Sequence, residues 1–368
     1  MVSKPKRIPV PGKTFYAWQY EEQTQIKHKV LGAYARIWVS KLGCKNNTLF
    51  FDCHGGCGAY VDHDGVVSYG SSIIVKKYAD EINKRRSTKT GVYYCEVDKG
   101  NYNNFLEVVK DCGLNTNSGK IVPYNNCFEE VIQNPTICRY YTEYPTLFLV
   151  DPFGFNFSVG VLSGLMKGHG NEIILNFMFD FINRFISVDA VEESYNHFFG
   201  SDQWKLAEHM NGQAREEYLV DLFKKKLKQV TGAKFVFAYR LCYPHKDQTY
   251  YYLIHATNHI DGITLMKTAF ASVNNGRVQY LGRNNDNMSF LDIGWVKSDE
   301  IYRTCLIGRR GRCISFERLW YEIVEDTAFT SKDLNEALIE LEKIGKVSVN
   351  RVSSKRGAYK ERDIIHIL

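Results

Sequence analysis

The sequence predicts an α/β protein with a doubly wound, mainly parallel sheet and a small C-terminal domain. Three observations predict it. Short segments that are apolar throughout alternate with helix-length amphipathic segments over residues 26–186, as a parallel sheet covered on both faces requires. Two further strand-like segments then follow each other without a helix between them. After about residue 305 the elements come in a different order, which indicates a separate domain.

The composition is that of a folded globular protein. The 368 residues are 44% apolar and 24% charged, with a formal net charge of +6, which excludes collagen-like and disordered chains. No segment has the roughly 18 consecutive apolar residues of a membrane span. The basic N-terminal residues are not followed by an apolar signal segment, so we expect a cytoplasmic protein.

The spacing of apolar residues predicts each element in turn. The first helix, 26–42, has Val30, Tyr34 and Trp38 on one face and ends at Gly43. Strands are expected at 48–53, 92–97, 120–123, 146–150 and 172–177, and helices at 71–84, 103–112, 127–133, 158–167, after 177 as far as 186, and at 214–230.

Segments 234–239 and 250–256 are expected to pair antiparallel and close the sheet edge. Such a pair after five parallel strands is the usual ending of class I methyltransferase sheets. Residues 15–300 are therefore expected to form a domain of that kind, with a helical insertion at about 188–231.

Residues 305–368 are expected to form a winged helix-turn-helix domain. A helix at 316–324 precedes a second helix whose start, Thr330 and Asp333, matches a capping box. Strands at 346–351 and 363–368 follow, with a basic tip between them. Because charge and fold coincide at this tip, Lys355, Arg356 and Lys360 are the residues expected to bind DNA or RNA.

The ten cysteines are expected to be reduced thiols. They are widely spaced, contain no Cys-x-x-Cys pair, and lie in a chain without a secretory signal. The closest pairs, 53/57 and 305/313, lack the two further ligands of a tetrahedral zinc site, so no metal is expected.

Three acidic residues stand at predicted strand ends, where open α/β sheets place their ligands. Asp52 ends the first strand before a glycine-rich turn that contains Gly56 and Gly58. Such a turn lets the backbone approach a ligand closely, although an ordinary tight turn capped by Asp52 explains the same residues. Glu96 stands where an acidic side chain binds ribose hydroxyls, or is simply solvated. Asp151, in the sequence Asp-Pro-Phe-Gly, could accept a proton from an exocyclic amine while Phe153 stacks on a base, or the segment is only a turn.

Four more residues are candidates for supporting this site. Thr24, Lys27 and His28 lie at the start of the first helix, where they could cap the site or hold an anion. A histidine on a helix is more often structural than catalytic. Arg184 could pair with a carboxylate or a phosphate, or form a surface ion pair without functional meaning.

Together these motifs resemble the three-Cys-motif partner (TcmP) family over residues 15–275. The resemblance rests on Gln-Thr-x-x-Lys-His at 23–28, Asp-x-x-x-Gly-x-Gly-x-Tyr at 52–60, Gly-Ser at 70–71, Glu96, Asp-Pro-Phe-Gly at 151–154, Asn176 and Arg184. His54 stands where the family has an apolar ring, and Ser72 replaces a proline. The resemblance implies a Rossmann-like methyltransferase fold and a partner protein with a three-cysteine, radical-S-adenosylmethionine-like motif.

The leading functional hypothesis is an S-adenosylmethionine-dependent methyltransferase-like protein that acts on an exocyclic amine of a nucleic-acid base. Asp52, Gly56, Gly58, Tyr60 and Glu96 would surround the cofactor, Asp151 would carry the chemistry and Phe153 would stack on the base. The alternative is a non-catalytic subunit that recognises nucleic acid for a modification or defence complex. A third hypothesis is a magnesium-dependent nuclease that uses the three strand-end carboxylates.

Overall fold

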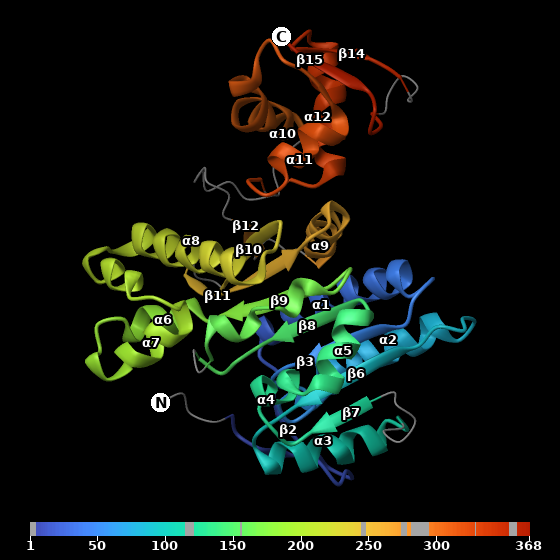
Figure 1. The fold of residues 1–368 in the computed structure, drawn as a ribbon, viewed down its shortest axis with the longest axis vertical. Helices are drawn as coiled ribbons and strands as arrows, with labels where there is room; N and C mark the ends of the chain where they lie inside the picture. Colours follow the sequence, from blue (N-terminus) through green and yellow to red (C-terminus); the bar gives the residue numbers. More distant parts are fainter. Residues whose placement is uncertain are drawn as a thin grey trace. The chain divides into compact units, whose positions relative to one another are not determined.

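The computed structural model describes residues 5–114, 121–154, 157–243, 248–273, 278–280, 294–327, 329–352 and 359–368. The chain divides into two units, Met1–Gly262 and Ile263–Leu368, and each is described by itself (Figure 1). All ten cysteines are free thiols. In the described residues, no helix combines the length and the apolarity needed to cross a bilayer.

Five parallel strands form the centre of the first unit: β3 (Thr48–Asp52), β6 (Thr90–Cys95), β7 (Ile121–Tyr124), β8 (Thr146–Val150) and β9 (Glu172–Phe177). Strand β3 pairs with both β6 and β8. The chain therefore runs outward from β3 through β6 to β7 and returns to β8 on the other side of β3. This reversal between β3 and β8 is a topological switch point, the place where open α/β sheets bind ligands outside the carboxyl ends of their strands.

Two antiparallel strands extend this sheet beyond β9, as the sequence predicts. Strands β10 (Phe235–Cys242) and β11 (Thr249–Thr257) pair with each other, and β11 also pairs antiparallel with β9. The strands of the first unit thus lie in the order β10-β11-β9-β8-β3-β6-β7. The predicted doubly wound, mainly parallel sheet with an antiparallel edge is confirmed.

Aromatic side chains link the central strands across one face of the sheet. Phe51 of β3 stacks on Tyr93 of β6 with ring centroids 5.4 Å apart, and lies 5.7 Å from the ring of Phe148 of β8. The strand register pairs Phe51 with both residues. Each such pair contributes about 0.5–1.5 kcal/mol beyond the burial of its area. The strands that are apolar throughout in the sequence therefore form the core of the first unit.

Helix α1 (Glu22–Leu42) precedes β3, and the helices that follow in this part of the chain are α2 (Ser71–Asn83), α3 (Lys99–Asp111), α4 (Phe128–Gln133), α5 (Pro135–Glu143) and α6 (Phe179–Phe185). Helix α1 begins before its predicted start. Helices α1 and α2 approach closely at Gly32, where an added Cβ would lie 3.1 Å from the Tyr78 ring. Helix α5 was not predicted; Pro135 occupies its first turn and the Asn134 side chain caps it by accepting from the Thr136 amide at 3.0 Å.

A second sheet in the first unit was not predicted. It contains β1 (Ile8–Pro9), β2 (Tyr16–Gln19), β4 (Ala59–Val61) and β5 (Val67–Tyr69), in the order β1-β2-β4-β5. Strands β2 and β4 are parallel, with Trp18 opposite Tyr60. The glycine-rich turn after β3 therefore leads into β4 and β5, and not directly into a helix as the sequence suggested. Strands of two to four residues are too short to show a clear period of two.

The helix predicted at 158–167 is wrong. Two short 3-10 helices, η1 (Val159–Leu162) and η2 (Leu165–Lys167), occupy this segment. Gly164 between them has φ +91°, which interrupts any continuous right-handed helix. The elements that follow are η3 (Asp189–Val191), α7 (Glu192–Phe199), η4 (Gln203–His209) and α8 (Gly212–Thr231), and α8 confirms the helix predicted at 214–230.

The second unit has helices packed with a three-stranded sheet. Its chain contains most of α9 (Ile260–Val273), then β12 (Val278–Tyr280), α10 (Gly294–Ile301), the π-helical turn η5 (Tyr302–Leu306), η6 (Ile307–Arg309), β13 (Cys313–Ser315), α11 (Phe316–Ile323), α12 (Ser331–Lys343), β14 (Val347–Asn350) and β15 (Ile364–Ile367). The strand order is β13-β15-β14. The predicted capping box is confirmed: the Thr330 hydroxyl accepts from the Asp333 amide at 3.2 Å, and the Asp333 carboxylate accepts from the Thr330 amide at 2.8 Å. Helices α9 and α10 and strands β12 and β13 were not predicted.

Candidate active site

Asp52 is the last residue of β3 and is fully buried. Its Oδ2 accepts hydrogen bonds from the hydroxyls of Ser71 and Ser72, at 2.5 and 2.8 Å, both in the first turn of α2. Its Oδ1 is buried and has no hydrogen-bond partner among the described residues. Burial raises the pKa of Asp52 to about 6, although the two serine bonds oppose the shift. Ser72, which stands where the similar family has proline, thus binds Asp52.

The glycine-rich turn after β3 is closely packed. Gly56 and Gly58 have φ values of +65° and +82°, a region that favours glycine. A Cβ added to Gly56 would lie 2.8 Å from the Trp18 ring, and one on Gly58 would lie 2.7 Å from Phe105. At Gly55 an added Cβ would lie 2.1 Å from the Tyr94 ring. The glycines are therefore required by packing, whatever ligand the turn binds.

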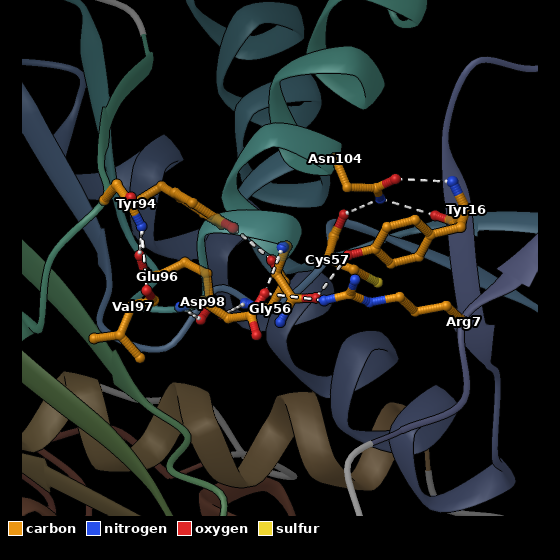
Figure 2. A network of polar contacts seen from close by, with 11 residues as sticks. Arg7, Tyr16, Gly56, Cys57, Tyr94, Glu96, Val97, Asp98 and Asn104 are labelled. Carbon is orange, nitrogen blue, oxygen red and sulfur yellow. Dashed lines mark hydrogen bonds and ion pairs between the residues drawn. The ribbon is translucent and has the colours of Figure 1, made fainter.

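Glu96 follows β6 and connects this turn to the start of α3 (Figure 2). Its two carboxylate oxygens accept from the backbone amides of Gly56 at 3.0 Å and Asp98 at 2.7 Å. Burial raises the pKa of Glu96, and these amide bonds partly offset the rise. The Tyr94 hydroxyl donates to the Gly56 carbonyl oxygen at 2.5 Å. The sequence-predicted residues Gly56 and Glu96 are thus brought into direct contact.

The N-terminal segment contacts the same network through Arg7, Tyr16 and Asn104, which were not predicted as site residues (Figure 2). Arg7 forms an ion pair with Asp98 at 3.0 Å. Asn104 of α3 accepts from the Tyr16 amide and donates to the carbonyl oxygens of Tyr16 and Cys57, each at 2.8 Å. These partners lie 47 to 91 positions apart along the chain, so no local sequence signal could reveal them.

A second polar cluster forms around Asp151, directly after β8. Lys27 of α1 makes an ion pair with its Oδ2, and the Asn176 amide of β9 donates to its Oδ1 at 2.6 Å. Burial alone raises the pKa of Asp151, but Lys27 and Asn176 outweigh it and the net shift is downward. Asp151 is therefore ionised at neutral pH. The register of β3 and β8 pairs Asp52 with Leu149, so Asp52 and Asp151 stand at the carboxyl ends of neighbouring strands.

His28 and Tyr60 belong to an aromatic cluster beside Lys27. His28 is buried, with its Nδ1 3.1 Å from the Tyr20 hydroxyl and its ring centroid 5.0 Å from that of Tyr60. Burial lowers the pKa of His28 to about 3, so it is neutral at physiological pH. Thr24 lies partly exposed in the first turn of α1, where Glu21 and not Thr24 occupies the N-cap position.

Trp18, which was not predicted as a site residue, contacts both the glycine-rich turn and the Asp-Pro-Phe-Gly segment. Its ring lies against Gly56, and its centroid is 5.5 Å from that of Phe153 in an edge-on contact. Phe153 itself is 48% exposed. The structure therefore joins the glycine-rich turn to the Asp-Pro-Phe-Gly segment, with an accessible aromatic ring at their junction.

His54, in the glycine-rich turn, is a further titratable group at this site. Its ring centroid lies 5.0 Å from that of Phe128, and its buried Nδ1 has no hydrogen-bond partner among the described residues. Burial lowers the pKa of His54 to about 4, although Asp151 opposes the shift. The neutral imidazole thus packs among aromatic rings.

The remaining predicted site residues are Arg184 and the basic tip of the second unit. Arg184 pairs with Asp180 one helical turn away, its side chain is 60% exposed, and no contact of the described residues joins it to Asp151. Lys355 and Arg356 lie outside the described residues. Lys360 is exposed, and its backbone amide donates to Asp363 at 2.8 Å. Among the described residues, no three His, Cys, Asp or Glu side chains are grouped closely enough to hold a metal ion.

Neither a protein-family model nor a curated protein matches the chain. Similar solved structures include a Legionella pneumophila protein of family DUF519, with 12% identity, TM-score 0.40, and coverage of 70% of this chain and 94% of that one. Spermidine synthase from Thermotoga maritima has 11% identity, TM-score 0.38 and coverage of 77% of each chain. A Streptococcus mutans protein described as a candidate methyltransferase, in complex with SAH, has 10% identity, TM-score 0.30, and coverage of 65% and 98%.

These TM-scores are too low to define the class of fold, which therefore rests on the strand order of this chain. The order of its parallel strands reverses between β3 and β8, and an antiparallel strand, β11, pairs with β9. This is the class I methyltransferase-like arrangement. The first unit is an α/β protein of this class, and its polar cluster lies at the carboxyl ends of β3, β6 and β8.

Proposed function

We propose that the protein is an S-adenosylmethionine-dependent methyltransferase that modifies an exocyclic amine of a nucleic-acid base. One observation carries the proposal. At the switch point of the sheet, β3 ends in Asp52, which has a buried oxygen without a donor among the described residues, and the neighbouring strand β8 leads into the Lys27-paired Asp151. A buried acceptor without a partner costs free energy unless a ligand supplies the donor.

The residues present fit the cofactor. Its amino group would donate to the Asp52 oxygen that has no protein donor. A carboxylate has about four acceptor positions; the amides of Gly56 and Asp98 take one on each Glu96 oxygen, and a further position could accept from a ribose hydroxyl. When bound, the cofactor supplies an electrophilic methyl group on a sulfonium.

Asp151 and Phe153 would position the acceptor base. The Asp151 carboxylate is ionised and therefore accepts a hydrogen bond from the exocyclic amine, orienting its nitrogen lone pair. Phe153 offers an exposed ring on which a base can stack. Because methyl transfer requires in-line approach within about 3–3.5 Å, this orientation is expected to contribute more than the basicity of Asp151.

The first test is a calorimetric titration of the full-length protein with S-adenosylmethionine and its demethylated product. We expect a dissociation constant on the order of micromolar, and binding weakened at least tenfold in Glu96→Gln. Asp64→Asn, in an exposed turn, is the matched control and should bind normally. Absence of binding to the wild-type protein would remove the cofactor from the proposal.

The second test measures transfer of a labelled methyl group to DNA and RNA. Asp151→Asn should abolish transfer while leaving cofactor affinity nearly unchanged, because Asp151 is assigned to the acceptor and not to the cofactor. Arg184→Ala should have no effect, because that side chain pairs with Asp180 at the surface. A normal rate in Asp151→Asn would exclude its assigned role.

Two finer assignments belong to the same proposal. We propose that the helices and the three-stranded sheet at 313–367 form a winged helix, supported by the order β13-α11-α12-β14-β15. The resemblance of the first unit to the TcmP family supports a partner with a three-cysteine motif. Co-elution of the purified pair by size exclusion would test that partnership, and separate elution at micromolar concentration would argue against it.

The alternative function is a non-catalytic nucleic-acid recognition subunit. It is favoured by the tight packing of the glycine-rich turn, where the Tyr94 ring already fills the space beside Gly55. This function requires nucleic-acid binding without cofactor binding or methylation. The calorimetric titration therefore separates the two proposals.

A further inference from the structure

Three arginines of the second unit converge on one carboxylate. Glu322 of α11 accepts from Arg309 Nε at 3.3 Å, from both terminal nitrogens of Arg312 at 3.1 Å each, and from Arg318 Nε at 3.2 Å. These bonds, with that from Arg312 the largest cause, lower the pKa of Glu322 to about 2. We call Arg309, Arg312, Arg318 and Glu322 the arginine cluster.

The cluster presents positive charge to solvent. The side chains of Arg312 and Arg318 are 48% and 65% exposed, whereas that of Glu322 is only 19% exposed. With three guanidinium groups around one carboxylate, the cluster keeps two net positive charges. Bidentate guanidinium groups match phosphate as well as carboxylate geometry, so the arginines are already oriented for an oxyanion ligand.

An exposed aromatic ring adjoins the cluster. Tyr321 is 44% exposed, and the guanidinium carbon of Arg318 lies 5.7 Å from its ring centroid. Arginines that track a phosphate backbone, next to an aromatic ring that accepts a base, form the usual surface for single-stranded nucleic acid. A duplex keeps its bases stacked internally and could not use this ring.

Helix α12 occupies the position of the groove-reading helix in a winged helix, but its charge is unfavourable. It carries two lysines against four acidic residues: Lys332, Asp333, Glu336, Glu340, Glu342 and Lys343. Lys332 pairs with Glu336 and Lys343 pairs with Glu340. An acidic helix is repelled by the phosphates that line a groove. Arg351 pairs with Glu342, and both lysines of α12 are paired within the helix, so α12 offers less positive charge to a phosphate than the arginine cluster does.

We propose that the arginine cluster and Tyr321, and not the exposed face of α12, form a nucleic-acid-binding surface of the second unit in addition to the predicted basic tip, and that this surface takes a single strand. The inference rests on the proposed function, because it assumes that nucleic acid is the substrate. Glu322 holds the arginines in place in the free protein and competes with the incoming phosphate.

The test is fluorescence anisotropy of labelled 20-nucleotide single-stranded DNA and RNA with the full chain at several salt concentrations. Arg312→Gln/Arg318→Gln should weaken binding at least tenfold and reduce the slope of log affinity against log salt by about 1.4, at about 0.7 per phosphate contact. Lys332→Gln/Lys343→Gln removes the same charge from α12 and should leave affinity within twofold.

Glu322→Gln gives a prediction of opposite sign. Removing the competing negative charge should tighten binding severalfold, whereas a purely structural ion pair would give unchanged or weaker binding. Tyr321→Ala should weaken binding to the single strand and leave binding to a duplex of the same sequence unchanged. Thermal unfolding checks that each variant is folded. If Glu322→Gln does not fold, the test rests on Arg312→Gln/Arg318→Gln, because both arginine side chains are exposed.

The outcomes distinguish this surface from the proposed function. If the wild-type protein binds the oligonucleotides and only the α12 lysine variant weakens binding, the surface is wrong and the nucleic-acid substrate stands. If the wild-type protein binds none of the probes, both the surface and the substrate class are wrong.

Discussion

At the residue scale, the burial of Asp52 predicts a pH dependence of folding. The pKa of Asp52 rises from 3.8 to about 6 on folding, so the folded protein binds this proton more tightly than the unfolded chain. The stabilising contribution of protonated Asp52 is complete below about pH 4 and is lost as pH rises to 6. The ionised carboxylate therefore costs on the order of 3 kcal/mol at neutral pH. Asp52→Asn should be more stable than the wild type at pH 7.5, as measured by urea unfolding, and should lose this pH dependence.

The same proton is expected to control ligand binding. A cationic amino group binds the ionised form of Asp52, so cofactor affinity should fall up to tenfold for each pH unit below 6. Asp52→Asn should bind weakly at every pH, and Asp64→Asn should keep the wild-type profile. A wild-type affinity that is constant between pH 5 and 7 would show that Asp52 does not contact the charged group.

The ion pair of Lys27 and Asp151 predicts a strong coupling. Both side chains are mostly buried, with 11% and 21% exposure, and removal of one partner leaves an uncompensated charge. Lys27→Met should lower the free energy of unfolding by about 3 kcal/mol, whereas Lys27→Met/Asp151→Asn should recover most of that loss. A double-mutant cycle by urea unfolding measures the coupling, and additive losses would contradict it.

Asp52, Glu96 and Asp151 could be identified from the sequence because parallel sheets bind ligands at the carboxyl ends of their strands. This rule needs only the position of each strand and no knowledge of distant partners. It could not identify what holds each carboxylate. Asp52 binds residues 19 and 20 positions away, and Asp151 binds Lys27 124 positions away. Lys27 itself entered the candidate site as part of a helix-start pattern, without an assigned partner.

At the element scale, the unpredicted N-terminal sheet depends on Asn104. This side chain makes three hydrogen bonds to the backbone of β2 and of the glycine-rich turn. Asn104→Ala leaves buried backbone groups without partners, so it should cost about 3 kcal/mol and release β2. Hydrogen exchange should then show lost protection at Tyr16–Gln19. Asn103→Ala, on the same helix but exposed, is the control, and equal effects of the two variants would refute the role of Asn104.

The elements that sequence patterns predicted share a physical basis. Strands buried on both faces are uniformly apolar, and the capping box of α12 is a local motif, so both are visible without tertiary information. No continuous helix forms over 158–167 because Gly164 adopts a φ of +91°, which ends the first helical turn despite the helical spacing of the apolar residues. The strands β1, β2, β4 and β5 are fixed by pairing across the chain, as between Trp18 and Tyr60.

At the scale of the whole molecule, the two units are expected to contribute separately to the proposed reaction. The arginine cluster lies in Ile263–Leu368 and the carboxylates lie in Met1–Gly262. Arg312→Gln/Arg318→Gln should therefore raise KM for nucleic acid at least tenfold with little change in kcat, and Asp151→Asn should lower kcat instead. Steady-state kinetics at fixed salt measures both constants. A fall in kcat alone for the arginine variant would show that its arginines do not act through substrate binding.

The change of element order near residue 305 predicted a separate C-terminal domain, but not where the surface charge of that region would gather. The basic tip was visible as a run of local residues. A basic run over 303–312 was visible too, but the sequence could not show that Arg309, Arg312 and Arg318 reach Glu322 from η6, from the segment before β13 and from α11, up to 13 positions away. Sequence alone shows runs of charge, whereas folding determines which charges neutralise each other.

The contact of Trp18 with Gly56 and Phe153 gives the protein a built-in optical reporter. An indole is a fluorophore whose emission maximum and quantum yield depend on the polarity and mobility of its surroundings. A ligand that enters beside the glycine-rich turn changes those surroundings, whereas the other four tryptophans of the chain supply a constant background. The difference between the emission spectra of the wild type and Trp18→Phe isolates this signal, so occupancy of the site can be followed in real time without any label.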